Sequence, residues 1–154
     1  MSRFFQLSFL LLALSVTIGC LDDPFSPEEQ LAKDTKKIKQ YLSDNGLTAQ
    51  STASGLHYII EVEGTGGHPD IDSEVTVDYK GYFLDGEVFD ETTSAPATFP
   101  LQNVILGWQE GIPLFKKGGK GKLFLPSGLA YGTNPPSGIP SNAVLAFDVE
   151  LVDF

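Results

Sequence analysis

The chain has 154 residues, of which 42% are apolar, so it is long enough for one ordinary domain with a sizeable core. Its net charge of −10 argues against a nucleic-acid partner, because proteins bind phosphate backbones largely through Lys and Arg. A single cysteine, Cys20, excludes an internal disulfide framework.

The first twenty residues predict export and membrane attachment. After Arg3 comes the apolar run FFQLSFLLLALSVTIG, which has the length of a secretory signal and is short for a membrane span. The run ends at Gly19 and Cys20, which resembles the lipobox of bacterial lipoproteins, although Thr17 stands where leucine is usual. We therefore predict a lipoprotein signal peptide over residues 1–19, lipidation of Cys20 and anchoring to a bacterial membrane, with the outer membrane favoured. The alternative is an ordinary signal peptide with an incidental cysteine.

Residues 20–54 predict a polar tether and one helix. In the segment 26–45, Ser26 can cap the helix, Pro27 suits its first position, Glu29 completes a capping box, and Gly46 follows its end. One stripe of this helix is apolar and carries Leu31, Ile38, Tyr41 and Leu42. The stripe could form a dimer seam, pack on the following domain or space that domain from the membrane. TAQSTASG, residues 48–55, is interpreted as a loose linker.

From residue 55 onward, apolar residues alternate with polar ones over 56–62, 75–80 and 145–151, which is typical of strands. KLFLP, residues 122–126, predicts another strand, and Asp85-Gly86 predicts a hairpin turn. Only VILGWQEGIPLF, residues 104–115, has helical spacing, with Gly107, Gly111 and Pro113 keeping that helix short. We predict an α+β domain over 55–154, an antiparallel sheet wrapped around one short helix, with the N-terminal helix outside it.

Covalent, metal-dependent and cofactor-dependent catalysis find little support. His57 and His68 have no second ligand at metal spacing, no serine lies in a nucleophile elbow, and GTGGHPD lacks the Lys-Ser/Thr of a phosphate loop. KKGGKGK, residues 116–122, gathers four lysines, and we interpret it as a solvated turn rather than a phosphate site. No cofactor and no metal are predicted.

Four strings carry a resemblance to a known family. They are VDYKGYFLDGEVFD, VILGWQEGI, LAYG and AVLAFDVELVDF, and in this order and near this spacing they resemble the FKBP-type peptidyl-prolyl cis-trans isomerases. The resemblance covers about residue 56 to the C-terminus. It implies an isomerase that acts on proline-containing polypeptides, here exported proteins, and that can bind ligands of the FK506 or rapamycin class.

The resemblance also implies a site. The catalytic set would be Tyr79, Phe89, Asp90, Ile105, Trp108, Tyr131 and Phe147, and the substrate-binding set Val104, Ile139 and Ala97. A proline ring would rest on Trp108, and the Ile105 amide and the Tyr131 hydroxyl would donate hydrogen bonds to the substrate. Asp90 would orient the rim, or would only cap its loop. The alternative for the aromatic residues is a place in the core, which we predict for Phe99, Phe115 and Phe124.

Two departures from the family weaken the expected catalysis. Ala97 stands where the family often has an aromatic residue, and the loop ETTSAPAT, residues 91–98, lacks the basic residue that usually accompanies Asp90. Two other functions therefore stay open at this stage. One is a non-catalytic chaperone or proline-binding module, and the other is a structural lipoprotein subunit that docks through the helix at 26–45.

Overall fold

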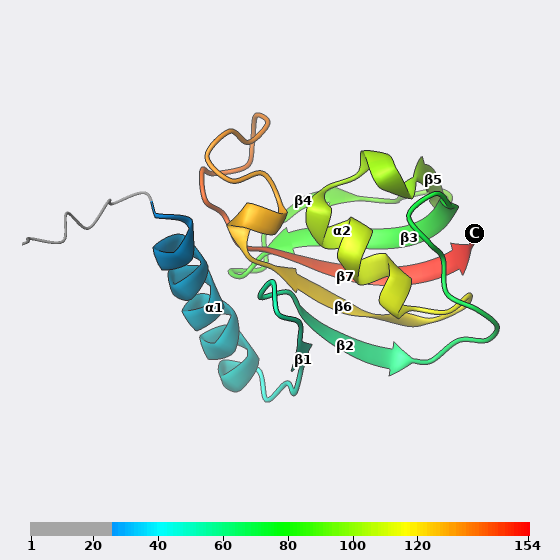
Figure 1. Ribbon diagram of the computed structural model, residues 1–154, viewed down its shortest axis with the longest axis horizontal. Coiled ribbons are helices and arrows are strands. Elements are labelled where there is room, and N and C mark those ends of the chain that lie inside the picture. Colours follow the sequence, from blue (N-terminus) through cyan, green and yellow to red (C-terminus); the bar gives the residue numbers. More distant parts are fainter. Residues whose placement is uncertain (1–25) are drawn as a thin grey trace, which may run out of the picture.

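The computed structural model describes residues 26–154, and it shows one antiparallel sheet with a helix on each of its two faces (Figure 1). The strands are β1 (Gln50–Ser51), β2 (His57–Val62), β3 (Glu74–Phe83), β4 (Val88–Glu91), β5 (Ala97–Pro100), β6 (Lys120–Leu125) and β7 (Leu145–Asp153). The helices are α1 (Pro27–Asp44) and α2 (Leu106–Gly111), with short 3₁₀ turns at Leu101–Asn103, Ile112–Leu114 and Ser127–Leu129. The predicted α+β class is confirmed.

The strands lie in the order β1-β2-β6-β7-β3-β4, and every pairing is antiparallel. The long strand β3 pairs with β5 through its first half, where Val75 faces Phe99, and with β4 through its second half, where Gly81 faces Asp90. Its other edge pairs with β7. The predicted turn at Asp85-Gly86 is confirmed, because it joins β3 to β4 with Gly86 at a φ of 94°.

Helix α2 lies across the concave face of the sheet and closes the main core (Figure 1). It begins later than predicted, because Val104 is extended and Ile105 is the N-cap residue. A Cβ atom at Gly107 would overlap the side chain of Leu125, and one at Gly111 would lie 2.8 Å from Cδ1 of Leu123. The two glycines thus let α2 approach β6 more closely than any other residue would allow.

Helix α1 packs on the opposite face of the sheet. Ile38 and Leu42 are buried in a second core with Tyr82, Phe124 and Ala146. The apolar stripe is therefore used within the chain, which is the second of the three alternatives that the sequence left open. The predicted capping box is wrong, because the Ser26 hydroxyl donates to the Glu28 carboxylate at 2.9 Å and makes no capping bond to the backbone.

The predicted loose linker at 48–55 is also wrong. Gln50 and Ser51 form β1, which pairs with β2, and the Ser54 hydroxyl contacts both carboxylate oxygens of Glu110 on α2 at 2.9 and 2.7 Å. Within residues 26–154, no helix combines the length and the apolar character that crossing a bilayer requires. The predicted signal peptide and Cys20 lie outside the described residues.

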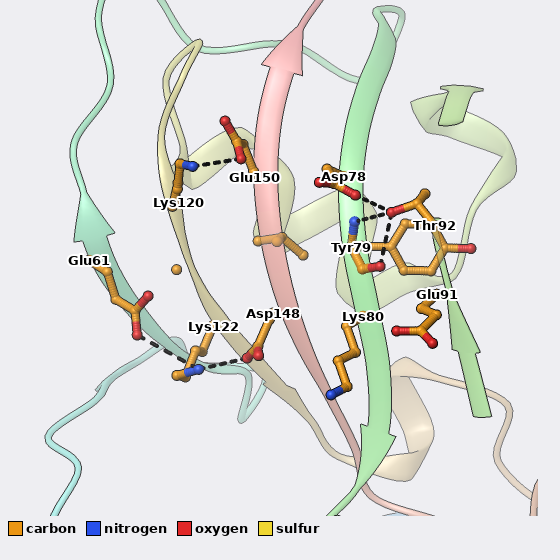
Figure 2. Close-up of a pocket in the computed structure, with 12 residues that line it drawn as sticks. Glu61, Asp78, Tyr79, Lys80, Glu91, Thr92, Lys120, Lys122, Asp148 and Glu150 are labelled. Atoms are coloured by element: carbon orange, nitrogen blue, oxygen red, sulfur yellow. Dashed lines mark hydrogen bonds and ion pairs between the residues drawn. The ribbon is translucent and has the colours of Figure 1, made fainter. Parts of the chain in front are cut away.

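Beyond α1, the outer face of the sheet is a ladder of charged side chains around a shallow depression of about 330 Å³ (Figure 2). Lys120 pairs with Glu150 at 2.7 Å, and Lys122 lies between Asp148 at 2.7 Å and Glu61 at 3.7 Å. Burial lowers the pKa of Lys122, but the hydrogen bond and charge of Asp148 outweigh it, so the pKa is raised.

The remaining two lysines of the 116–122 segment also face carboxylates. Lys116 lies 4.0 Å from Glu63, and Lys117 lies 2.6 Å from Asp153. Because all four lysines of this segment have acidic partners, the segment does not present a free cationic cluster to a phosphate group. It is also only partly a turn, since Lys120 and Lys122 belong to β6.

Candidate active site

A cavity of about 320 Å³ opens on the concave side of the sheet, beside the start of α2. It is lined by Tyr79, Phe89, Asp90, Phe99, Asn103, Val104, Ile105, Trp108, Tyr131 and Phe147. These side chains come from four strands, from the segment that leads into α2, from α2 itself and from the loop after β6. The structure thus brings together every residue of the predicted catalytic set, together with Val104.

Trp108 is held by three aromatic rings and is only 4% exposed. Its ring centroid lies 5.1 Å from that of Tyr79, 5.4 Å from Phe147 and 5.9 Å from Phe99, with interplanar angles between 78° and 88°. Such edge-to-face contacts are each worth about 0.5–1.5 kcal/mol beyond the buried area. The indole is therefore a fixed surface in the cavity rather than a side chain free to change rotamer.

The indole nitrogen of Trp108 is buried and has no hydrogen-bond partner within residues 26–154. A buried donor left without an acceptor costs about 1–3 kcal/mol, so such an atom calls for an explanation. The rings packed around the indole are those of Tyr79, Phe99 and Phe147, and none of them accepts a hydrogen bond from its nitrogen. The wall of the cavity thus contains one buried donor without a partner in the described residues.

Gly81 allows two further rings of the cavity to meet. It lies opposite Phe147 in the ladder between β3 and β7, and a Cβ atom there would come within 2.7 Å of Phe89 and 2.9 Å of Phe147. The two rings contact each other above it, with centroids 5.6 Å apart and planes at 90°. Sequence reasoning did not single out Gly81, although a glycine inside a strand often marks such a close approach.

Asp90 accepts a hydrogen bond from the Tyr79 hydroxyl at 2.7 Å. The sequence predicted that this carboxylate lacks a basic partner, and its partner in the structure is a phenol. Burial and then the hydrogen bond to Asp90 raise the pKa of Tyr79 well above its usual range. Burial and the nearby Asp90 charge also raise the pKa of Tyr131, so both hydroxyls keep their protons at neutral pH.

Besides the indole N–H of Trp108, the Ile105 amide and the Tyr131 hydroxyl have no acceptor in the part of the chain that the structure describes. The carbonyl of Ile105 accepts from Trp108 and Gln109 at the start of α2, whereas its own amide has no partner. The Tyr131 hydroxyl makes no hydrogen bond, and the residue is 37% exposed. A ligand carbonyl that enters the cavity would therefore meet unpaired N–H and O–H groups beside the aromatic rings of the wall.

The remaining predicted residues lie at the margin of the cavity or beyond it. Ile139 lines a neighbouring depression that shares Phe89, Asp90 and Tyr131 with the main cavity. Ala97 lies on β5 opposite Val77 and does not line the cavity. Phe99 lies two residues further on the same face of β5, and its side chain forms the part of the cavity wall that β5 contributes.

The core prediction for Phe99 holds only in part, because the half-buried ring packs against the main core but also lies in the cavity wall against Tyr79 and Trp108. Phe115 and Phe124 are buried as predicted. Asn103, which also lines the cavity, was missed as well. Its only sequence signal is its place directly before Val104 and Ile105.

Comparison with known proteins matches residues 66–152 to the family of FKBP-type peptidyl-prolyl cis-trans isomerases. The chain belongs to this family. Every residue that lines the cavity lies inside the matched range, whereas α1 and β1 precede it. The FKBP domain of this chain thus supplies the whole cavity.

Among relatives, FkpA from Aeromonas hydrophila is 46% identical over 129 residues, which are 81% of this chain and 48% of the relative. FkpA from Escherichia coli is 43% identical over 124 residues, or 79% of this chain and 45% of the relative. Both are named FKBP-type peptidyl-prolyl cis-trans isomerases. The chain thus spans about half the length of the curated relatives that it matches.

Solved structures show the same fold. The crystal structure of FkpA from Escherichia coli superposes with a TM-score of 0.71 at 41% identity, covering 82% of this chain and 61% of that one. The crystal structure of AtFKBP13 has a TM-score of 0.64 at 31% identity, covering 69% of this chain and 98% of that one. The predicted sheet around one short helix is therefore the FKBP fold.

Proposed function

We propose that this chain accelerates cis–trans isomerisation of peptide bonds that precede proline, in polypeptides that are exported like the chain itself. One observation carries the proposal: an aromatic cavity in an FKBP domain presents the Ile105 amide and the Tyr131 hydroxyl, two donors that have no acceptor among residues 26–154. The chemistry suits the residues present, because rotation about a peptide bond neither makes nor breaks a covalent bond and requires no nucleophile.

The barrier that the protein has to lower is the rotational barrier of the peptide bond. Rotation breaks amide resonance and has a barrier of about 18–20 kcal/mol, so unaided exchange at X-Pro bonds takes roughly 10–100 s. Bringing it to milliseconds requires a rate gain of about 10⁵, which corresponds to roughly 7 kcal/mol. This free energy has to come from binding the twisted amide more tightly than the planar one.

The cavity offers two sources of such selective binding. The twisted amide has less charge separation between O and N, so an apolar wall around Trp108, Phe89 and Phe147 favours it over the planar form. We assign the Ile105 amide as the donor that holds the substrate carbonyl after proline, and the Tyr131 hydroxyl as the second donor. Fixed donors of this kind need no reorganisation during the rotation.

The remaining residues position these groups or contact the neighbours of proline. We propose that Asp90 fixes the Tyr79 ring, which in turn holds the edge of Trp108. Val104 forms one lip of the cavity, and Ile139 lies at its margin beside Tyr131. We propose that these residues, with Ala97 further out on β5, contact the side chains that flank the proline.

An isomerisation assay on an X-Pro peptide with the full chain tests the proposal. Tyr131→Phe removes the cavity hydroxyl and should lower kcat/KM by about tenfold, which is 1.4 kcal/mol. Tyr82→Phe is the matched control, since its hydroxyl binds Asp148 on the outer face. Peptide binding without acceleration in the unmodified chain would overturn the proposal and leave a non-catalytic proline-binding module.

We propose further that the same cavity accepts ligands of the FK506 or rapamycin class. Support comes from the apolar wall and from Trp108, whose ring is part of that wall and is the only tryptophan in the chain. Adding rapamycin should change the fluorescence of Trp108. Unchanged fluorescence despite binding measured by calorimetry would place the ligand elsewhere on the protein.

We also propose that the chain is exported and anchored through a lipid on Cys20, with the outer membrane favoured. The support is the sequence: the apolar run before Cys20 ends at the only cysteine. Stable anchoring generally takes more than one acyl chain, which a lipidated N-terminal cysteine would supply. Cys20→Ala should abolish lipid-linked processing, and unchanged membrane partitioning of this variant would contradict the proposal.

A further inference from the structure

Asp34 is a buried carboxylate on α1, far from the cavity in sequence and outside its lining. Its side chain is 0% exposed. Oδ2 accepts hydrogen bonds from the Ser127 amide at 2.9 Å and from the Ser127 hydroxyl at 2.6 Å, and Oδ1 accepts from Gln30 at 2.8 Å. The Lys37 ammonium lies 3.7 Å from Oδ1. The carboxyl group is withdrawn from water here, and each of its oxygens has a polar partner.

Ser127 connects Asp34 to the segment of the chain that lines the cavity. It is 1% exposed, and its carbonyl accepts hydrogen bonds from the amides of Ala130 at 3.0 Å and Gly132 at 2.9 Å. These two residues flank Tyr131, which lines the cavity. Asp34 therefore holds the amide side of Ser127, and the carbonyl side of Ser127 holds both neighbours of Tyr131.

A further hydrogen bond connects this segment to the loop that carries Ile139, at the margin of the cavity. The carbonyl of Gly132 accepts from the amide of Asn142 at 2.8 Å, which closes the loop that bears Ile139. In Figure 1 this loop rises above the sheet between α1 and α2. The loop from Ser127 to Asn142 is thus held by Asp34 as well as by the strands β6 and β7 at its two ends.

The attachment is separate from the apolar packing of α1. Ile38 and Leu42 lie against Tyr82, Phe124 and Ala146 on the outer face of the sheet, and none of these residues lines the cavity. These apolar contacts hold α1 on the sheet independently of Asp34 and Ser127. A buried carboxylate aimed at the loop adds little that a hydrophobic residue could not supply for stability alone.

We propose that Asp34 is a positioning residue of the isomerase site, acting through Ser127 to hold the Tyr131 hydroxyl where it can donate to the substrate. The inference rests on the proposed function only for the role of Tyr131. It makes α1 a part of the catalytic unit, although α1 lies outside the residues that match the FKBP family. Small displacements of positioning groups can lower rates by as much as about 10²-fold.

The first test compares Asp34→Asn with Ile38→Val in the full chain. Ile38 is the matched control, because it lies one turn further on the same helix and is equally buried, but contacts the sheet. Asp34→Asn should lower kcat and kcat/KM by the same factor, about tenfold, as expected for an interaction realised in the transition state. Ile38→Val should reduce thermal stability and leave kcat unchanged.

A double-mutant cycle identifies the path. In a Tyr131→Phe background, Asp34→Asn should produce little further loss, since the hydroxyl that it positions is already gone. Ser127→Ala removes one of the two bonds to Asp34 and keeps the other, so it should have an intermediate effect even if Asp34→Asn folds poorly. The inference would be overturned if the losses of kcat from Asp34→Asn and Tyr131→Phe were additive, or if kcat were unchanged in both Asp34→Asn and Ser127→Ala.

Amide hydrogen exchange provides a readout that does not depend on activity. Asp34→Asn should speed exchange at Ala130 and Gly132, whereas Ile38→Val should not do so selectively. An unmodified chain that fails to isomerise proline peptides would refute the proposed function and leave this measurement intact. Unchanged exchange at these two amides would refute the inference about Asp34, whatever the activity.

Discussion

The carboxylate of Asp90 acts on two phenols of the cavity, Tyr79 and Tyr131. It accepts a hydrogen bond from Tyr79, and its charge also acts on Tyr131. Burial and this charge raise the pKa of each phenol, which means that each keeps its proton to higher pH in the folded protein than in the unfolded chain. Tyr82 behaves in the same way on the outer face, where burial and Asp148 raise its pKa.

This predicts a loss of stability at alkaline pH. An unfolded tyrosine ionises near pH 10, whereas the pKa values of Tyr79, Tyr82 and Tyr131 in the folded protein are raised above that of the unfolded chain. Because the raised folded-state pKa favours the neutral form, its contribution is fully present below about pH 10 and is lost as the pH rises further. The tyrosinate absorbance of the folded protein near pH 11 should therefore be lower than that of the denatured chain.

The variant Asp90→Ala separates the cavity phenols from Tyr82. It should lower the pKa of Tyr79 and Tyr131 and leave that of Tyr82 unchanged, because Tyr82 faces Asp148 instead. The control is Asp148→Ala, for which the opposite pattern is expected. Identical titration curves for Asp90→Ala and the unmodified protein would show that the carboxylate does not act on the cavity phenols.

Some residues of the site could be predicted from the sequence, and others could not. Trp108, Tyr131 and Phe147 could be predicted because each lies in a string typical of the FKBP family. Phe99 could not, because an aromatic residue on an alternating strand fits the core equally well. Asp34 could not either, because an aspartate on an otherwise charged helix is normally solvated, and only the fold reveals that it faces the Ser127 amide.

At the scale of elements, the alternation of apolar residues predicted the strands well. Leu145, Phe147, Val149 and Leu151 form one buried face of β7, as their spacing of two residues indicates. The structure of residues 48–55 was harder to predict, because polar residues around a two-residue strand carry no periodic signal. Their order comes from pairing with β2 and from the bond between Ser54 and Glu110, which depend on the tertiary structure.

The placement of α2 predicts the effect of a single methyl group. Gly107→Ala adds a Cβ atom that overlaps the side chain of Leu125, so α2 or Leu125 must move to make room for it. Overpacking of this kind destabilises a protein by about 1–3 kcal/mol. Because Trp108 follows Gly107 directly, the shift should also change its fluorescence and lower the isomerase rate. Chemical unfolding and the peptide assay measure the two effects.

Gly67→Ala is the matched control for this substitution. A Cβ atom at Gly67 meets nothing within 4 Å, and its backbone is not in the left-handed region. Gly111→Ala should lie between the two, since its Cβ would approach Leu123 at 2.8 Å. Equal stability of the Gly107 and Gly67 variants would show that α2 is not packed on β6 as closely as described.

On the scale of the whole molecule, two cores share one sheet. Leu123 and Leu125 of β6 face α2, whereas Phe124 between them faces α1, and Ala146 on β7 likewise lies between Leu145 and Phe147. Because β6 and β7 belong to both cores, neither helix can leave without exposing apolar surface of the central strands. The N-terminal helix lies outside the family match in sequence, yet it is one unit with the FKBP domain in its packing.

This arrangement predicts that α1 and the cavity unfold together. Ile38→Ala deletes a fully buried side chain from the outer core and should lower the free energy of unfolding by about 2–5 kcal/mol. The loss should appear equally in far-ultraviolet circular dichroism, which reports largely on α1, and in the fluorescence of Trp108 on the other face of the sheet. Coincident transitions by two such probes indicate one cooperative unit. If the dichroism of the variant changed at a lower denaturant concentration than the fluorescence, α1 would be a separately melting appendage, and the common role of β6 and β7 would have to be given up.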